Sequence, residues 1–295
     1  MITLDDIAYV RSGAADLQNA VRFAVDIVGL ELVAQENGIA YLRADHRHHC
    51  LALVEGDSGV LASGFLLADT AALDAAQDEL ELAGVKVARG TPEQARERRV
   101  REFLAFDDPF GNRLELAVGQ VQLARPIRWG RPAGITEFGH LCVDAADVRE
   151  AHAFYSSLFN MRVSDWIGDK ACLIRIDPVH HKFAVFQGDR PGLCHMDFQV
   201  ESLDDVMRSW HFLEEQGVEI EMGPGRHPQS TAVVLYFKGP EGFTYEYSWG
   251  VRRIEDDATW RPRTFDPTEP DAIDMWRGRT QMPTTQLQLD RTLGA

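Results

Sequence analysis

Three polar residues interrupt apolar strand patterns in the second half of the chain, and together they have the composition of a metal site. His140 lies in FGHLCV, His195 in GLCHMDFQV and Glu246 in FTYEYSW. One histidine on an apolar strand is usually a hydrogen-bonded core residue, but that reading does not explain two imidazoles and a carboxylate at corresponding levels of three strands. Such a set forms the facial triad of non-heme Fe(II) sites, which leaves the opposite coordination positions open for substrate and dioxygen.

The elements that must position these residues come from an internal repeat. With an offset close to 131 residues, corresponding segments follow one another in the same order in both halves. The matching pairs are 7–10 with 138–141, 16–28 with 147–159, 48–57 with 180–189, 73–74 with 203–204, and 108–119 with 239–250. Segments 16–28 and 147–159 have the periodicity of amphipathic helices, and 73–74 and 203–204 stand at the head of a second helix in each half. The other segments contain short strand patterns.

Each half therefore reads strand, helix, strand, strand, strand, and then the same unit again. This order predicts an α+β fold of four βαβββ modules, paired into two tandem domains at residues 1–124 and 135–250. The stretch ARPIRWGRPAG at 124–134 is typical of a linker. Paired modules of this kind enclose a cavity that is open enough for a ligand. We expect segment 251–295, which has little periodic structure, to pack on the second domain or at an oligomer interface.

The repeat also supplies an internal control for the metal hypothesis. At the 131-residue offset, Tyr9, Gly64 and Glu115 stand where the second half has its two histidines and its glutamate. The first half keeps one carboxylate but neither imidazole, so we expect it not to bind metal. Glu115 is then interpreted as a structural or solvated residue.

The composition limits the partners of the chain. Its 295 residues carry a net charge of −16, which argues against nucleic acid because phosphate binding requires a basic surface. The four cysteines, at positions 50, 142, 172 and 194, form no CxxC pair and indicate reduced thiols in a cytoplasmic protein. No segment has the pattern of a signal peptide or the length of a membrane span, so we expect a soluble protein without a membrane partner.

Two stretches of the second half carry a specific resemblance. Segment 225–250 begins Gly-Arg-His, has a tyrosine nine residues after that histidine, and continues through a Pro-x-Gly turn to Glu246. The stretch HHKFAVF contains His181, fourteen residues before His195. With the duplicated fold, these features resemble the type I extradiol ring-cleaving dioxygenases of the vicinal oxygen chelate superfamily, such as dihydroxybiphenyl and catechol 2,3-dioxygenases. The resemblance covers essentially the whole chain.

This resemblance implies an enzyme with two tandem vicinal-oxygen-chelate domains, of which only the second holds metal. It implies one Fe(II) ion, or Mn(II) with the same ligands, and O2 as co-substrate. The implied reaction is extradiol cleavage of a substituted or bicyclic catechol in the degradation of aromatic compounds, by a protein that is usually a homo-oligomer. The residues that match the metal ligands of the family are His140, His195 and Glu246.

Three further residues match catalytic positions of the family. His181 matches the acid–base histidine, His227 the histidine that hydrogen-bonds a substrate hydroxyl, and Tyr236 the tyrosine beside the bound catecholate. An imidazole takes a catechol proton near neutral pH, and once protonated it stabilises the charge that develops on dioxygen. We expect His180 to turn away or to support its loop, because the doublet at 48–49 in the first half repeats the pattern.

The sequence specifies the substrate pocket less closely. Ser230 stands where dihydroxybiphenyl-cleaving members typically have an aspartate, and this departure points to a variant substrate class. Trp260 and its neighbours are candidates for a lid over the site. The candidates for the lining of the pocket are Cys142, Leu173, Phe183, Gln229 and Ser230.

A second class of function stays open, namely a non-oxygenase member of the same superfamily. It would be a glyoxalase-like isomerase or a metal-free ligand-binding protein. Glyoxalase-type members commonly take carboxylate ligands from both halves of a shared site, and Tyr9 and Gly64 argue against that here. A metal-free binding protein would have no need of the three second-half ligands together. Iron content and oxygen uptake with a catechol separate these possibilities.

Overall fold

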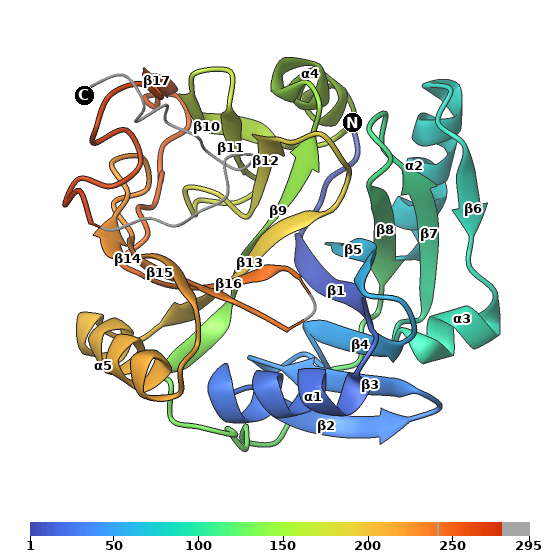
Figure 1. Ribbon diagram of the computed structural model, residues 1–295. Helices are drawn as coiled ribbons and strands as arrows, with labels where there is room; N and C mark the ends of the chain where they lie inside the picture. Colours follow the sequence, from blue (N-terminus) through green and yellow to red (C-terminus); the bar gives the residue numbers. More distant parts are fainter. Residues whose placement is uncertain (241, 279–295) are drawn as a thin grey trace. The chain divides into compact units, whose positions relative to one another are not determined.

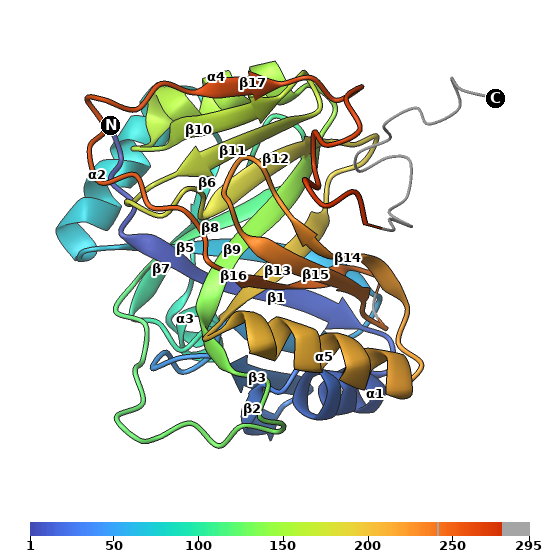
Figure 2. The same ribbon diagram turned by 90° about the vertical axis from the view of Figure 1, so that its left-hand side faces the viewer.

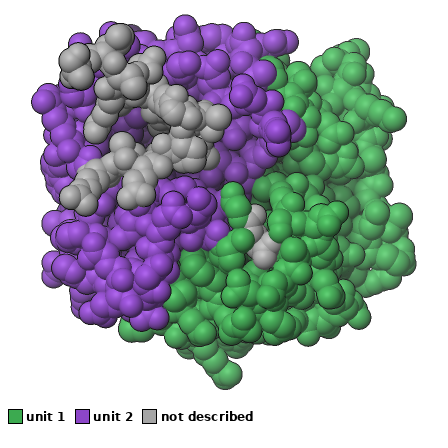
Figure 3. Space-filling view, in the orientation of Figure 1, with its two compact units in different colours: residues 1–132, 153–161, 240–242 green, residues 133–152, 162–239, 243–295 purple. Residues whose placement is uncertain are grey.

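The computed structural model describes residues 1–240 and 242–278 of the chain. These residues form two compact units, coloured separately in Figure 3. Unit 1 contains the described residues of 1–132, 153–161 and 240–242, and unit 2 contains those of 133–152, 162–239 and 243–278. Residues 279–295, the last part of the predicted tail, lie outside the described residues.

The first half of the chain forms an eight-stranded sheet in the order β2-β3-β4-β1-β5-β8-β7-β6 (Figure 1). Its elements are β1 (Asp6–Ala14), α1 (Leu17–Arg22), the π-helical turn η1 (Phe23–Ile27), β2 (Glu31–Glu36), β3 (Ile39–Arg43), β4 (Leu51–Glu55), β5 (Gly59–Leu67), α2 (Thr70–Leu82), β6 (Val87–Arg89), α3 (Pro92–Glu97), β7 (Glu102–Asp107) and β8 (Arg113–Val118). The two modules meet where β1 runs antiparallel to β5.

The second half repeats this plan in a nine-stranded sheet of order β14-β15-β16-β13-β9-β12-β11-β10-β17. Its elements are β9 (Ile135–Ala145), α4 (Val148–Leu158), β10 (Arg162–Ile167), β11 (Ala171–Arg175), β12 (Phe183–Gln187), β13 (Leu193–Val200), α5 (Leu203–Glu215), β14 (Ile220–Arg226), β15 (Val233–Lys238), β16 (Thr244–Trp249) and β17 (Arg263–Phe265). Its two modules meet where β9 runs antiparallel to β13. In Figure 2, α5 runs along the strands of its own module, which it contacts.

Side-chain caps fix where several helices begin. Asp16, Asp69 and Ser202 each accept a hydrogen bond from the backbone N–H three residues later, at the starts of α1, α2 and α5. Helix α3 begins with a capping box at Thr91, followed by Pro92 in its first turn. The letters TPEQ therefore carried the signal for α3, an element that the module pattern did not include.

The prediction of an α+β fold made of four βαβββ modules is confirmed. The additions to the predicted plan are α3 and β17, and β17 pairs in parallel with β10 over three residues. Strand β17 is contributed by the tail, whose residues Ile254, Ala272 and Ile273 are buried. Across residues 1–240 and 242–278, no helix combines the length and the apolar character that a membrane span requires.

Candidate active site

Three central strands of unit 2 place the predicted metal ligands on one face of the sheet. Asp197 of β13 is paired with His140 of β9 on one side and with Glu246 of β16 on the other. Paired residues of neighbouring strands point to the same side, and so do residues two positions apart on one strand. His195 stands two positions before Asp197, so the pleat brings both imidazoles and both carboxylates together.

The candidate ligand atoms of His140, His195 and Glu246 form a small triangle, here called the ligand triangle. His140 Nε2 lies 3.1 Å from His195 Nε2 and 3.0 Å from Glu246 Oε2, and His195 Nε2 lies 3.3 Å from the same oxygen. Two metal–ligand bonds of about 2.1 Å that meet at a right angle place their ligand atoms about 3.0 Å apart. The ligand triangle therefore has the size of one face of an octahedral metal site.

The charges around the triangle favour a bound cation. Glu246 Oε2 is buried and accepts no hydrogen bond within the described part of the chain. Burial raises the pKa of Glu246 to about 7, although His140 opposes the shift. Burial alone would lower the pKa of His140, but the carboxylates of Asp197 and Glu246 outweigh it and raise that pKa well above its ordinary value. A divalent ion on the triangle would balance both carboxylates, so the residues fit a metal.

Asp197 is a second buried carboxylate, which sequence reasoning missed. Its Oδ2 lies 3.3 Å from His140 Nδ1 and accepts a hydrogen bond of 3.0 Å from Ser248 Oγ. A Cβ atom at Gly139 would stand 1.9 Å from Asp197 Oδ2, so glycine at this position makes room for the carboxylate. With a metal bound, the contact with Asp197 would keep the proton of neutral His140 on Nδ1, so that Nε2 would be the ligand atom. The available signal was an acidic residue two positions after a candidate ligand on an alternating strand.

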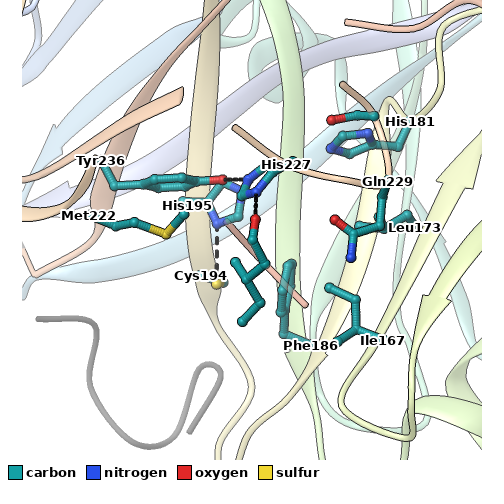
Figure 4. Close-up of a pocket in the computed structure, with 12 residues that line it drawn as sticks. Ile167, Leu173, His181, Phe186, Cys194, His195, Met222, His227, Gln229 and Tyr236 are labelled. Carbon is teal, nitrogen blue, oxygen red and sulfur yellow. Dashed lines mark hydrogen bonds between the residues drawn. The ribbon is translucent and has the colours of Figure 1, made fainter. Parts of the chain in front are cut away.

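The three predicted catalytic residues line a cavity together with His195 (Figure 4). His227 Nδ1 donates a hydrogen bond of 2.6 Å to the carbonyl of Ile273, and His227 Nε2 accepts one of 2.8 Å from the Tyr236 hydroxyl. Burial lowers the pKa of His227, and burial together with neighbouring imidazoles lowers the pKa of His181 well below its ordinary value. Both rings are therefore neutral near neutral pH, and each keeps a lone pair on one ring nitrogen.

The same cavity contains three of the five predicted pocket residues, namely Leu173, Gln229 and Ser230. Cys142 is not among the lining residues; it lies at the ligand triangle, with its Sγ 2.9 Å from His195 Nε2.

Phe183 is likewise not among the lining residues of the cavity. On β12 the side chains alternate, so Phe186 points to the cavity side and Phe183 to the other. The lining residues that the sequence did not indicate are Ile167, Phe186, Cys194, Met222 and Ile273.

The tail supplies part of this wall with its main chain. The carbonyl of Ala272 accepts a hydrogen bond of 2.6 Å from Gln229 Nε2, and the carbonyl of Ile273 is the partner of His227. Trp260, the candidate lid residue, donates from its indole nitrogen to the carbonyl of Ser164 over 2.8 Å and is not among the residues that line the cavity.

The strand register of unit 1 corrects one comparison made from the sequence. Gly64 lies opposite Tyr9, just as Asp197 lies opposite His140 in unit 2. Gly64 therefore corresponds to Asp197, and the expectation that it takes the place of His195 was wrong; the alanine two positions earlier holds that place. Here the offset between the halves is 133 residues, because the connections before this strand differ in length. A shift of two residues keeps the same face of the sheet, which is why the pattern concealed it.

Glu115 of unit 1 does correspond to Glu246, and it is buried rather than solvated, with 1 % of its surface exposed. It accepts a hydrogen bond of 2.7 Å from the Tyr9 hydroxyl. A Cβ atom at Gly64 would stand 2.8 Å from the Tyr9 ring, so glycine admits the tyrosine. Within the described residues, the groups of side chains close enough to share an ion all lie in unit 2.

Comparison with known proteins adds to this geometry. The model of the Glyoxalase/Bleomycin resistance protein/Dioxygenase superfamily matches residues 6–116 and 137–247. The chain belongs to this superfamily. The two matches coincide with the two pairs of modules, as the internal repeat requires.

Several members of the superfamily resemble the chain over most of its length. A 1,2-dihydroxynaphthalene dioxygenase from Sphingobium xenophagum is 28% identical over 86% of this chain and 91% of its own length. An iron-dependent extradiol dioxygenase from Rhodococcus jostii is 27% identical over 93% and 97%. Among solved structures, a Mn(II)-bound glyoxalase from Novosphingobium aromaticivorans has a TM-score of 0.84 and 27% identity, covering 97% of this chain and 94% of that chain.

Proposed function

We propose that the chain is an extradiol dioxygenase, which cleaves a catechol ring with O2 at a single Fe(II) ion. The observation that carries the proposal is the metal-sized ligand triangle beside a buried cavity that also holds His181, His227 and Tyr236. The resemblance to proteins named as extradiol dioxygenases, one of them named as iron-dependent, supports it.

An Fe(II) ion held by His140, His195 and Glu246 would supply the Lewis-acid and redox chemistry for the reaction of a catechol with O2. The protein side chains supply the proton chemistry. The tail carbonyl of Ile273 fixes the proton of His227 on Nδ1, so that Nε2 accepts from the Tyr236 hydroxyl. A substrate hydroxyl that displaces Tyr236 from His227 would donate to the same nitrogen and leave the phenol free to hold the catecholate oxygen.

His181 faces the same cavity from another side. Its ring centroid lies 4.3 Å from that of the predicted ligand His140, so it stands beside the ligand triangle. As a neutral imidazole it can take a catechol proton, and as an imidazolium it can return that proton when the O–O bond breaks.

The cavity walls support an uncharged, substituted catechol, with a second ring or a comparable apolar group. Its sides are formed largely by apolar side chains, including Ile167, Phe186 and Met222. No arginine or lysine is among the described residues that line it, so a substrate carboxylate would find no cationic partner there. Gln229 and Ser230 supply the additional polar groups.

A substrate panel tests the proposal. The protein, loaded anaerobically with Fe(II) or with Mn(II), is mixed with catechol, 3-methylcatechol, 1,2-dihydroxynaphthalene and 2,3-dihydroxybiphenyl. We expect a yellow ring-opened product with one O2 consumed per ring, and His195→Ala as an inactive control. Glyoxalase-type isomerisation is the second candidate, which the similarity to the Mn(II)-bound glyoxalase favours. No oxygen uptake with any catechol, together with isomerase activity of the Mn(II) form, would establish it instead.

We also infer a homo-oligomer in the cytoplasm. The resemblance to extradiol dioxygenases of aromatic degradation supports both inferences. Size-exclusion chromatography with light scattering measures the mass against the 33.1 kDa of one chain.

A further inference from the structure

Behind His181 lies a series of hydrogen-bonded side chains that leads away from the cavity. His181 Nδ1 lies 3.2 Å from His180 Nδ1, and His180 Nε2 lies 2.9 Å from Asp165 Oδ2. All three side chains are buried. His180 therefore does not simply turn away from the site, because it connects the predicted acid–base histidine to a buried carboxylate.

The chemistry of the partners determines where the protons lie. A carboxylate only accepts hydrogen bonds, so the proton between His180 and Asp165 belongs to His180 Nε2. Burial lowers the pKa of His180 in spite of Asp165, so the ring is neutral and its Nδ1 carries a lone pair. The proton between the two imidazoles then belongs to His181 Nδ1, which donates it to His180 Nδ1. Neutral His181 therefore keeps its lone pair on Nε2, the nitrogen left for the cavity.

Arg263 of β17 holds the carboxylate at the end of this series. The backbone N–H and Nε of Arg263 both donate to Asp165 Oδ1, over 2.8 and 3.1 Å, and its Nη2 donates to Oδ2 over 2.5 Å. Burial alone would raise the pKa of Asp165, but hydrogen bonds from His180 and Arg263 outweigh it and lower that pKa. Asp165 is therefore ionised and oriented.

Unit 1 shows that the histidine doublet does not need this carboxylate for its shape. His48 Nδ1 lies 3.3 Å from His49 Nδ1, almost as in unit 2. The residue that corresponds to Asp165 is Ala34. Asp165 pairs with Leu173 and Ala34 pairs with Tyr41, in each case directly after a register shift between the two strands. The carboxylate thus occurs behind the doublet only in the unit that has the ligand triangle, among the described residues.

We propose that Asp165 and His180 are positioning residues, which hold His181 in the tautomer that carries its proton on Nδ1 and presents a bare Nε2 to the substrate. The proposal rests on the proposed function, in which His181 takes a catechol proton. A fold-supporting role for His180 would require only its contact with Asp165, whereas the positioning role requires its contact with His181. The two contacts use different ring nitrogens and can be removed separately.

Two substitutions at His180 separate these roles. The side-chain oxygen of asparagine takes the place of Nδ1, so His180→Asn keeps an acceptor for His181 and loses the contact with Asp165. The amide nitrogen of glutamine takes the place of Nε2, so His180→Gln keeps the donor to Asp165 and loses that acceptor. We expect His180→Asn to keep kcat within about threefold, and His180→Gln to lower it about 100-fold with KM and iron content unchanged. The reverse order would overturn the proposal and assign His180 to fold support.

Asp165→Asn provides a readout that does not depend on turnover. Arg263 places two donors on Oδ1 and one on Oδ2, so the amide oxygen is expected at Oδ1, and the amide nitrogen then faces His180. That nitrogen donates to His180 Nε2, so the proton of His180 moves to Nδ1. His180 Nδ1 then donates to His181 Nδ1, and the proton of His181 moves to Nε2. The measurement is the 15N spectrum of histidine-labelled protein loaded with diamagnetic Zn²⁺, with His181 assigned by His181→Ala. A parent protein with its His181 proton on Nε2, or an unchanged tautomer in Asp165→Asn, would contradict the proposal.

His48→Gln in unit 1 is the matched control, and it should leave kcat unchanged. The spectrum also separates two kinds of failure. If the parent protein cleaves no catechol, the proposed function fails, while the tautomer of His181 still tests the Asp165–His180 series. If it cleaves catechols and the two His180 variants do not differ, the positioning role fails alone.

Discussion

The guanidinium of Arg98 holds both carboxylate oxygens of Glu115: Nε donates to Oε2 and Nη2 donates to Oε1, each over 2.7 Å. In unit 1, the Arg98 cation thus balances the charge of Glu115, the residue that corresponds to Glu246 in unit 2. A guanidinium has no open coordination position, so we expect unit 1 to keep the fold without metal chemistry.

Replacing Glu115 by alanine should destabilise the protein without changing its metal content. The substitution leaves Arg98 charged and largely buried without its bidentate partner, at an expected cost of about 3 kcal/mol in the free energy of unfolding. Chemical denaturation measures the loss, and metal analysis of the purified variant measures the occupancy. Glu246→Ala is the matched control and should lose the metal. Metal loss in Glu115→Ala would refute the one-site arrangement.

His195→Ala and His181→Ala should separate metal binding from proton transfer. The first removes a corner of the ligand triangle, so metal and activity should disappear together. The second leaves the triangle intact and should lower kcat by about 100-fold or more at unchanged metal content. Metal analysis beside steady-state kinetics distinguishes the two, and full metal content in His195→Ala would remove that residue from the ligand set.

Asp197→Asn should weaken metal binding by about 10- to 100-fold, because the carboxylate orients His140 and increases its basicity. Gly139→Ala should do the same, since the new Cβ would occupy the place of Asp197 Oδ2. The measurement is competition with a chelator of known affinity. Ser248→Ala, which removes only a hydrogen bond to Asp197, should have a smaller effect; equal affinities in all three variants and the parent would show that Asp197 does not act on the metal.

Asp144, at the end of β9, should make stability fall as the pH rises. Burial raises its pKa to about 7 in the folded protein, above the ordinary value of an unfolded aspartate. Between those two pKa values the folded state binds more protons than the unfolded state, so the free energy of unfolding decreases with pH. The difference in free energy of unfolding between Asp144→Asn and the parent should therefore shift by about 2 kcal/mol in favour of the variant from about pH 4 to about pH 8. Chemical denaturation at the two pH values measures this shift. An equal difference in free energy of unfolding between variant and parent at both pH values would contradict the raised pKa of Asp144.

The sequence predicted the modules and the ligand triangle because both depend on periodicity and on residue type. It failed where two distant strands must be placed in register. A constant offset matched Gly64 with His195, since a two-residue shift preserves the alternation of faces. It also proposed Phe183 instead of Phe186 for the cavity, because size and apolar character do not reveal which face of a strand is turned inward. Asp165 and Asp197 were missed because their importance lies in contacts with residues distant in the chain.

The main-chain carbonyls of Ala272 and Ile273 complete the surroundings of Gln229 and His227, although the last of the predicted metal ligands is Glu246. A chain that ends between residues 247 and 271 therefore carries the whole ligand triangle but lacks this part of the cavity wall. In such a chain His227 would lose the carbonyl that fixes its proton on Nδ1. Competence for the reaction would appear only after residue 273 has left the ribosome, so prematurely terminated products that retain every metal ligand should load metal and still be poor catalysts.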